Sequence, residues 1–219
     1  HLKKTHDISV NIMPIDVLPN MAWRLDRHGR RLLLSEVLKG PSRIFQLPIS
    51  VGLLGYQGLL DEMVTQTGLV GEEAQQLCRL GLANYFAGCI IMPYERFHMA
   101  ADNLRYDIEL LCQRFSTSYE QIAHRLTTLQ RPGSHGVPFF FLRVDHAGNI
   151  SKRFSASGFH FARFGGTCPR WNIHEAFRTP DKIIPQLVGT EDGTNYFTIS
   201  RTVRSMVGTG YKVPEQQLA

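Results

Sequence analysis

Residues 71–93 have the sequence GEEAQQLCRLGLANYFAGCIIMP, and this stretch does most to decide the fold. Two glutamates stand where acidic side chains favour a helix start, the apolar residues recur at helical spacing, and Pro93 ends the pattern. The most apolar part, residues 77–92, carries Arg79 and is too short to span a bilayer. We therefore predict a long, buried helix.

The residues before this helix predict three further segments. Residues 1–20 contain two prolines and are expected to form a loop or linker. Residues 21–35 predict a β-hairpin, with Gly29 at the turn position that needs a positive φ. Residues 43–60 are apolar, and we expect Pro48 near a helix start or in a loop, because proline disrupts a helix interior.

The residues after the long helix continue the helical pattern. Residues 94–99 predict a short helix. In residues 104–126 the apolar side chains keep helical spacing on both sides of a polar break, which predicts a helix–turn–helix pair with Ser118 as an N-cap. Residues 131–136, RPGSHG, predict the clearest linker in the chain.

Beyond this linker the apolar period changes from that of helices to that of strands. PFFFLRV and ISKRFS predict a hairpin at 138–155, and IIPQLV and NYFTISRTV predict another at 183–203. A short helix is expected at the end of the aromatic segment 157–177. The predicted fold class is α+β, with a mostly helical domain at 1–130 and a smaller α+β domain with antiparallel strands at 131–219.

Composition limits the class of protein. A chain of 219 residues with 43% hydrophobic content buries about 70% of its surface or more, so it is not disordered. The net charge of +5 suits a polyanionic ligand or nucleic acid. Four cysteines are too few for a disulfide scaffold, so we expect a reducing cytoplasm. The chain shows no signal peptide or membrane span, and we expect it to be an internal part of a longer protein.

The helix pair at 104–126 permits two interpretations. A DNA-reading helix carries polar and basic residues on its exposed face, and residues 119–126 offer a mixed set. Two helices packed in a core have the same pattern. A direct nucleic-acid-binding function, using this pair and the basic cluster from Arg24 to Arg31, is therefore kept as the alternative hypothesis.

Residues 152–171 combine basic and aromatic side chains. Arginine and lysine neutralise phosphates, and aromatic faces stack on bases. The combination fits a nucleotide-bearing ligand, such as a coenzyme A ester, or single-stranded nucleic acid. Alternatively, the phenylalanines are core-facing strand residues and the basic residues are their solvated neighbours.

The chain contains no H-E-x-x-H, G-x-S-x-G, G-x-G-x-x-G or P-loop motif. However, LANYFAGCIIMPYERF at 82–97 resembles a phrase of the ImmA/IrrE-type metallopeptidase family, which follows an H-E-x-x-H helix. On this resemblance Ile49 and Leu53 stand for the two zinc-binding histidines, and Ser50 stands for the catalytic glutamate. Ile and Leu offer zinc no donor atom. The resemblance therefore implies a zincin-like domain that has lost its zinc and its enzymatic activity, with an apolar former cleft that either holds an acyl chain or is filled.

Residues 105–153 and the segment FHFARFGGTCPRWNIHEAF at 159–177 resemble the short-chain fatty acyl transcriptional regulators of actinobacteria, among them mycobacterial regulators of the methylcitrate and glyoxylate pathways. The resemblance covers the chain from about Arg43 onward. It implies a promoter-binding helix–turn–helix domain before residue 1, a sensor domain at 131–219, and recognition of short-chain acyl-CoA such as propionyl-CoA. It also implies a [4Fe–4S] cluster held by cysteines, to which this segment contributes only Cys168, so we expect no intact cluster here.

The leading hypothesis is the acyl-CoA-sensing core of a transcription factor, with no membrane partner, promoter DNA bound through another domain, and a homo-oligomeric state. The predicted ligand-binding side chains share either a positive charge for phosphates or an aromatic ring for the adenine and acyl channel. The basic candidates are Arg43, Lys152, Arg153, Arg163 and Arg170. The aromatic candidates are Tyr94, Phe154, Phe161 and Trp171.

Overall fold

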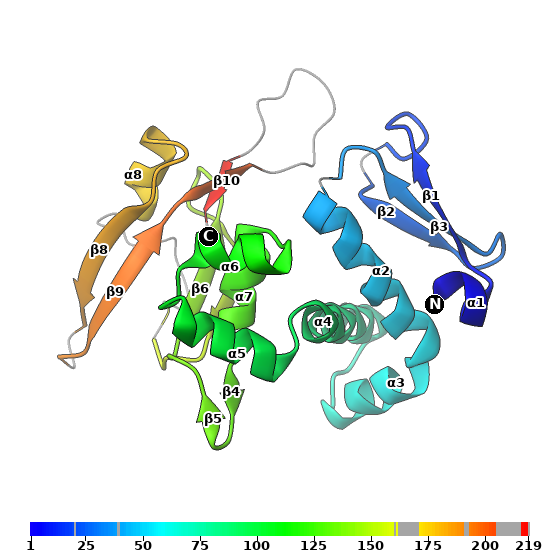
Figure 1. Ribbon diagram of the computed structural model, residues 1–219, viewed down its shortest axis with the longest axis horizontal. Helices are drawn as coiled ribbons and strands as arrows, with labels where there is room; N and C mark the ends of the chain where they lie inside the picture. The colour runs from blue at the N-terminus through cyan, green and yellow to red at the C-terminus, as the bar shows by residue number, and fades with distance from the viewer. Residues whose placement is uncertain are drawn as a thin grey trace. The chain divides into compact units, whose positions relative to one another are not determined.

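The computed structural model describes residues 1–19, 21–38, 40–159, 161, 171–190, 193–204 and 216–218. The chain forms two compact units (Figure 1). Unit 1 contains residues 1–106 and 113–118, and unit 2 contains residues 107–112 and the chain from residue 119 onward. Within the described residues, no helix has both the length and the apolarity required to cross a membrane.

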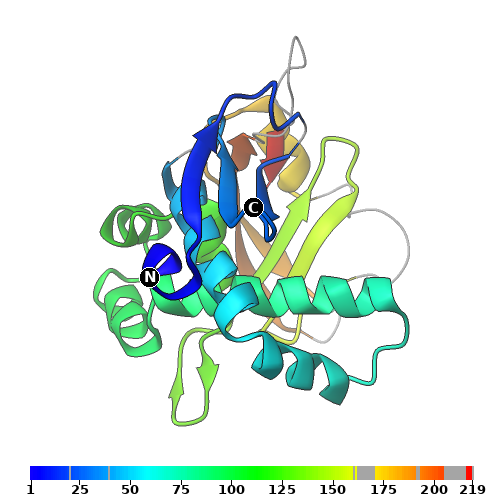
Figure 2. The same cartoon turned by 90° about the vertical axis from the view of Figure 1, so that its right-hand side faces the viewer.

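Unit 1 packs helices against a three-stranded sheet. The strands are β1 (Ser9–Met13), β2 (Trp23–Asp26) and β3 (Arg31–Ser35), in the order β1-β3-β2. The central strand β3 pairs in parallel with β1 and antiparallel with β2 (Figure 2). The helices are α1 (Leu2–His6), α2 (Gly40–Gly55), α3 (Gln57–Gln66), α4 (Glu72–Ile91) and α5 (Tyr94–Asn103).

Helix α2 is the centre of unit 1 because two of its faces are buried. Leu47, Val51 and Leu54 pack against the cluster that contains the sheet residues Leu32 and Leu34. The other face of α2 packs against α4. Residues two positions apart on a helix point about 200° apart, so Leu47 and its neighbour at 49 face opposite sides. Helix α2 is thus held between the sheet and α4.

Unit 2 is built from antiparallel sheets and short helices. The main sheet has the order β10-β11-β6-β7, with β6 at Phe140–Val144, β7 at Ile150–Ser155, β10 at Thr202–Arg204 and β11 at Gln216–Leu218. The pairs β4 (Gln130–Arg131)–β5 (Ser134–His135) and β8 (Ile184–Gly189)–β9 (Asn195–Ser200) form separate hairpins. The helices are α6 (Ile108–Phe115), whose last three residues belong to unit 1, α7 (Tyr119–Leu126) and α8 (Ile173–Arg178).

Strand alternation gives the β6–β7 hairpin two different faces. Leu142 and Val144 of β6 pack with Ile173 and Ala176 of α8 in one buried cluster. The side chains between them point to the opposite face, which contacts α7. Unit 2 therefore has an apolar side toward α8 and a charged side toward α7.

Most predicted elements are confirmed. The long helix is α4, the short helix after it is α5, and the helix–turn–helix pair is α6 and α7. The three hairpins are β2–β3, β6–β7 and β8–β9, and the short helix after the aromatic segment is α8. The α+β fold class is correct.

Two predictions for the N-terminal region are wrong. Residues 1–20 are not a loop, since they contain α1 and β1; Ile8, Val10 and Ile12 alternate as in a strand, and pairing with β3 stabilises it. Pro48 lies inside α2. Its ring removes the N–H that would bond to the carbonyl of Ile44, and burial of both faces of α2 keeps the helix continuous.

Two turn predictions also need correction. The positive φ in the β2–β3 turn belongs to Arg30, at 51°. Gly29 serves a close approach instead, because its N–H donates to Asp26 Oδ1 at 2.8 Å and a Cβ there would lie 2.3 Å from Asp26 Oδ2. The segment 131–136 is not an open linker, since it closes the β4–β5 hairpin through Gly133 with a φ of 76°.

Candidate ligand-binding site

The positions that align with the zinc site lie in the apolar core of unit 1. Ile49 is 2% exposed and packs against Ala83 of α4, and Leu53 lies beside the same cluster. Ser50 is completely buried, and its hydroxyl donates to the Gln46 carbonyl at 3.0 Å. Apolar packing therefore surrounds the three positions that the metallopeptidase resemblance aligns with the zinc site.

On the α7 face of β7, Lys152 is committed to an ion pair. Its ammonium lies 2.5 Å from Glu120 Oε1, and the Arg143 guanidinium lies 3.0 Å from the same oxygen. Burial favours the neutral form of Glu120, but the two cations together outweigh it and lower the pKa of the carboxyl. Lys152 thus connects β7 to α7 in this structure.

Phe154 lies on the same face as Lys152 and packs on a histidine. The Phe154 ring centroid is 4.1 Å from that of His124 in α7. Burial, followed by the nearby positive charge of Lys152, lowers the pKa of His124 to about 4. His124 is therefore neutral at pH 7 and acts here as a stacking partner.

Arg153 points to the opposite face of β7, where the aromatic candidates gather. Its guanidinium carbon lies 5.7 Å from the centroid of the Phe161 ring, within the range of a cation–π contact. Phe161 meets the ring of Phe159 edge-on at 5.0 Å, and Trp171 lies 5.9 Å from Phe159. The exposed Arg153 therefore stands over a continuous aromatic cluster.

Strand geometry divides the predicted site. Lys152, Arg153 and Phe154 are consecutive, and successive side chains of a strand point to opposite faces. The structure brings Arg153, Phe161 and Trp171 together and places Lys152 and Phe154 on the other side of the sheet. The three consecutive residues do not form one contiguous site on this hairpin.

The two candidates in unit 1 are partly or wholly enclosed. The Arg43 guanidinium donates to the carbonyls of Glu36 and Leu38, at 3.1 and 2.9 Å, so it ties the start of α2 to the preceding turn. Tyr94 is 8% exposed and stacks on His98 with ring centroids 6.2 Å apart. Both side chains have local structural contacts besides any role in ligand binding.

Arg163, Cys168 and Arg170 lie outside the described residues. Three cysteines lie within them, Cys78 and Cys89 in α4 and Cys112 in α6, and burial raises the pKa of the Cys112 thiol to about 11. An iron–sulfur cluster is held by cysteine thiolates, and a raised pKa makes the thiolate form of Cys112 less populated. No three His, Cys, Asp or Glu side chains gather as a metal site in this part of the chain, so the described residues do not fit an iron–sulfur cluster.

Sequence reasoning missed two aromatic members of the cluster, Phe140 and Tyr196. Phe140 stacks on Phe159 at 4.4 Å, and Tyr196 of β9 meets Phe159 edge-on at 4.9 Å. Alternation in PFFFLRV and NYFTISRTV gave a signal for inward-facing aromatic residues. Alternation gave no signal that the two hairpins, β6–β7 and β8–β9, both contact the ring of Phe159.

The described contacts of α7 do not suit a DNA-reading helix. None of its residues, 119–126, is exposed. Glu120 binds cations of the sheet and His124 stacks on it, so these polar side chains serve the packing of unit 2. The helix–turn–helix pair was predicted correctly as a structure, and the core-packing interpretation describes it.

Two family models match the chain. The IrrE N-terminal-like domain matches residues 3–127, and the C-terminal domain of the short-chain fatty acyl coenzyme A regulator matches residues 128–219. The solved structure of a Mycobacterium tuberculosis transcriptional regulator has a TM-score of 0.90 and 40% identity, covering 99% of this chain and 66% of that one.

Similar full-length proteins are regulators by name. The HTH-type transcriptional regulators RamB and PrpR of Mycobacterium tuberculosis are 46% and 42% identical over 202 and 211 residues, covering 92% and 96% of this chain. The propionyl-CoA carboxylase regulator of Cereibacter sphaeroides is 47% identical over 193 residues, or 88% of this chain. The chain spans 42–43% of the length of these relatives.

Proposed function

Because this chain belongs to the family that joins an IrrE N-terminal-like domain to a short-chain fatty acyl coenzyme A regulator domain, we propose that it is the effector-binding core of a transcription regulator. Its effector is a short-chain acyl-CoA, with propionyl-CoA as the first candidate. The name of one relative, the propionyl-CoA carboxylase regulator, supports a regulatory role in propionate metabolism. Promoter binding belongs to another part of the full-length protein.

The observation that carries this proposal is Arg153 over the aromatic cluster of unit 2. Coenzyme A presents phosphates beside a flat adenine ring, and an exposed guanidinium beside aromatic faces complements both. Phe161 and Trp171 supply apolar ring surface on the same face of the sheet. Lys152 does not belong to this cluster, because its ammonium binds Glu120 on the α7 face of the sheet.

Ligand binding changes transcription only through a difference in affinity between two states of the regulator. Discrimination among acyl groups is graded, since each methylene contributes about 1 kcal/mol. We therefore expect acetyl-, propionyl- and butyryl-CoA to differ in affinity by severalfold, without exclusion of any one of them.

Calorimetric titration of the chain with propionyl-CoA, free CoA and propionate tests this function. Stoichiometric binding of the ester, with weaker binding of CoA and no measurable binding of propionate, is expected. Equal affinity for CoA and ester would contradict acyl sensing. Absence of heat with all three, from a folded sample, would overturn the assignment.

The variant Arg153→Ala tests the residue that carries the proposal. A hydrogen bond to a charged group contributes about 1.5–3 kcal/mol, so we expect propionyl-CoA to bind about 10- to 100-fold more weakly. Arg178→Ala is the matched control, because the Arg178 side chain is 80% exposed on α8 and pairs only loosely with Glu175 at 3.5 Å. Equal losses in both variants would indicate a general effect of charge.

A further inference from the structure

Unit 1 contains a pocket of about 770 Å³, and none of the acyl-CoA candidates among the described residues lines it. This volume lies within the range of small-molecule and peptide side-chain pockets. The pocket lies between strand β1 and helices α2 and α4, and apolar side chains make up most of its wall. The main lining residues are Val10 from β1, Leu47 and Val51 from α2, Phe86 and Ile90 from α4, and Tyr56.

The strand beside this pocket is an unpaired edge. Among the described strands, β1 pairs only with β3. The Ser9 N–H donates to Arg30 on the β3 side, and the Met13 carbonyl accepts from Glu36 on that side. The alternation of a strand then turns the N–H and C=O groups of Val10 and Ile12 toward the free edge. Edges of this kind accept an added strand.

The side chains on this edge are also exposed. Val10 is 45% exposed and Ile12 is 54% exposed, although both share the face of the sheet that packs on α2. Helix α2 therefore leaves the apolar face of β1 uncovered. A peptide added beside β1 places every second side chain, about 6.8 Å apart, on the same face as Val10 and above the pocket.

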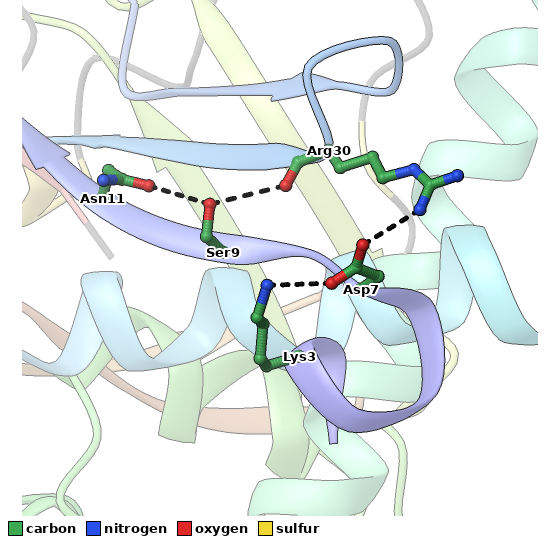
Figure 3. Close-up of polar contacts among 5 residues, drawn as sticks. All are labelled: Lys3, Asp7, Ser9, Asn11 and Arg30. Carbon is green, nitrogen blue, oxygen red and sulfur yellow. Dashed lines mark hydrogen bonds and ion pairs between the residues drawn. The ribbon is translucent and has the colours of Figure 1, made fainter.

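The rim of the pocket is positively charged. Lys3, which lines the pocket, and Arg30 both bind the carboxylate of Asp7, at 2.8 and 2.9 Å (Figure 3). These hydrogen bonds hold the pKa of Asp7 below its ordinary value. One carboxylate facing two cations leaves a net positive charge. An acidic ligand is favoured at this position.

We propose that the edge of β1 binds an extended peptide segment of a partner protein by strand addition. Alternate apolar side chains of that segment enter the pocket, and an acidic residue at one end faces the Lys3–Asp7–Arg30 rim. Main-chain hydrogen bonds to Val10 and Ile12 supply affinity, while the pocket and the rim supply specificity. The residues of this site belong to unit 1, and the proposal does not rest on the acyl-CoA assignment in unit 2.

The first test uses the peptide fluoresceinyl-Glu-Leu-Thr-Leu-Thr-Leu-Glu-amide, with the dye on the N-terminal amine, titrated into the chain and followed by fluorescence anisotropy. We expect saturable binding that weakens with added salt. N-methylation of alternate amides, on the edge that would pair, should weaken binding at least about tenfold, because it removes the ladder hydrogen bonds. Replacing both glutamates by lysines should also weaken it. Equal binding of the N-methylated peptide, or no saturable binding of the parent, would overturn the proposal.

The second test places the peptide at this pocket. Ile90→Arg puts a charge into the pocket from a side chain that is 50% exposed, so the fold should survive. We expect at least about tenfold weaker peptide binding and unchanged binding of propionyl-CoA. Leu77→Arg, at a 65% exposed position of the same helix away from the pocket, is the control and should bind normally. Equal peptide affinity in the two variants would overturn the site, and a dimer that Ile90→Arg dissociates would show that a second copy is the occupant instead.

Discussion

Helix α2 and strand β7 each carry residues that the sequence analysis singled out as site candidates, and the two elements place these residues differently. In α2, Ile49 and Leu53 are four residues apart and lie at the same apolar cluster. In β7, Lys152 and Arg153 are adjacent and point to opposite faces of the sheet. The helix keeps Ile49 and Leu53 on one side, whereas the strand separates neighbouring charges.

The two regions should lose stability under different changes. The aligned positions of α2 are held by apolar packing, so they have no ionisable group whose state depends on pH. The α7 face of β7 is held by a carboxylate, two cations and a neutral histidine. We therefore expect the stability of unit 1 to fall most when buried side-chain volume is removed from α2. The stability of unit 2 should fall most when a charge is removed or the pH is lowered. Trp23 lies in unit 1 and Trp171 in unit 2, so single-tryptophan variants report each separately.

The largest effect should come from emptying the filled zinc position. We expect Ile49→Ala to lower the free energy of unfolding of unit 1 by about 2–4 kcal/mol, because Ile49 is buried and its loss leaves a cavity. Urea denaturation followed by Trp23 fluorescence measures this loss. Ile44→Ala, on the same helix at 50% exposure, should cost less than about 0.5 kcal/mol. Similar losses at both positions would contradict a packed cleft.

Low pH should lower the stability of unit 2 through His124. The folded pKa of His124 is about 4, below the ordinary 6.5, so the unfolded chain binds the proton first as pH falls. Stability is therefore full above pH 6.5, and between pH 6.5 and 4.5 about 2 kcal/mol is lost. Urea midpoints from Trp171 fluorescence across this range measure the loss. His124→Phe keeps a ring on Phe154 and should remove this slope; a slope that persists would assign the acid sensitivity elsewhere.

Removing the charge of Glu120 should have a somewhat smaller effect. Glu120→Gln leaves Lys152 and Arg143 without their anion, and because these side chains are 38% and 21% exposed, we expect a loss of about 1–2 kcal/mol. Thermal unfolding of unit 2 at pH 7 measures it. The control is Glu109→Gln, at a 58% exposed carboxylate 2.6 Å from Arg201, for which less than about 0.5 kcal/mol is expected. A larger loss in the control would reverse the ranking of the two pairs.

The smallest effects distinguish two glycines of unit 1. Gly81 lies in the interior of α4, and an added Cβ would meet nothing within 4 Å, so Gly81→Ala should raise stability by about 0.5–1 kcal/mol. Gly52 lies in α2, where a Cβ would come 3.0 Å from Phe86 Cδ1. Gly52→Ala should therefore gain nothing or lose stability, as measured by thermal unfolding. A stabilising Gly52→Ala would mean that Phe86 can move away.

Local pattern was sufficient for the elements with strong periodicity. Helix α4 was predicted from helical spacing ended by Pro93, and the β6–β7 hairpin from two alternating runs joined by a polar turn. It was insufficient for β1, where Ile8, Val10 and Ile12 alternate but the nearby prolines favoured a loop. It was also insufficient for Pro48, because burial on both faces of α2 outweighs one lost hydrogen bond.

Residue types alone show that Ile49 and Leu53, which the metallopeptidase resemblance aligns with zinc-binding histidines, cannot bind zinc, because Ile and Leu lack donor atoms in any fold. The sequence also determined the helices and hairpins with strong periodicity, such as α4 and β6–β7, because periodicity is a local property of the chain. Only the tertiary structure decided that Glu120 takes Lys152, 32 residues away, while Arg153 stands over Phe161. These pairings depend on which face of a sheet meets which helix. Contacts between elements that are distant in sequence determine which face of the sheet packs on which helix, and the local sequence pattern does not contain this information.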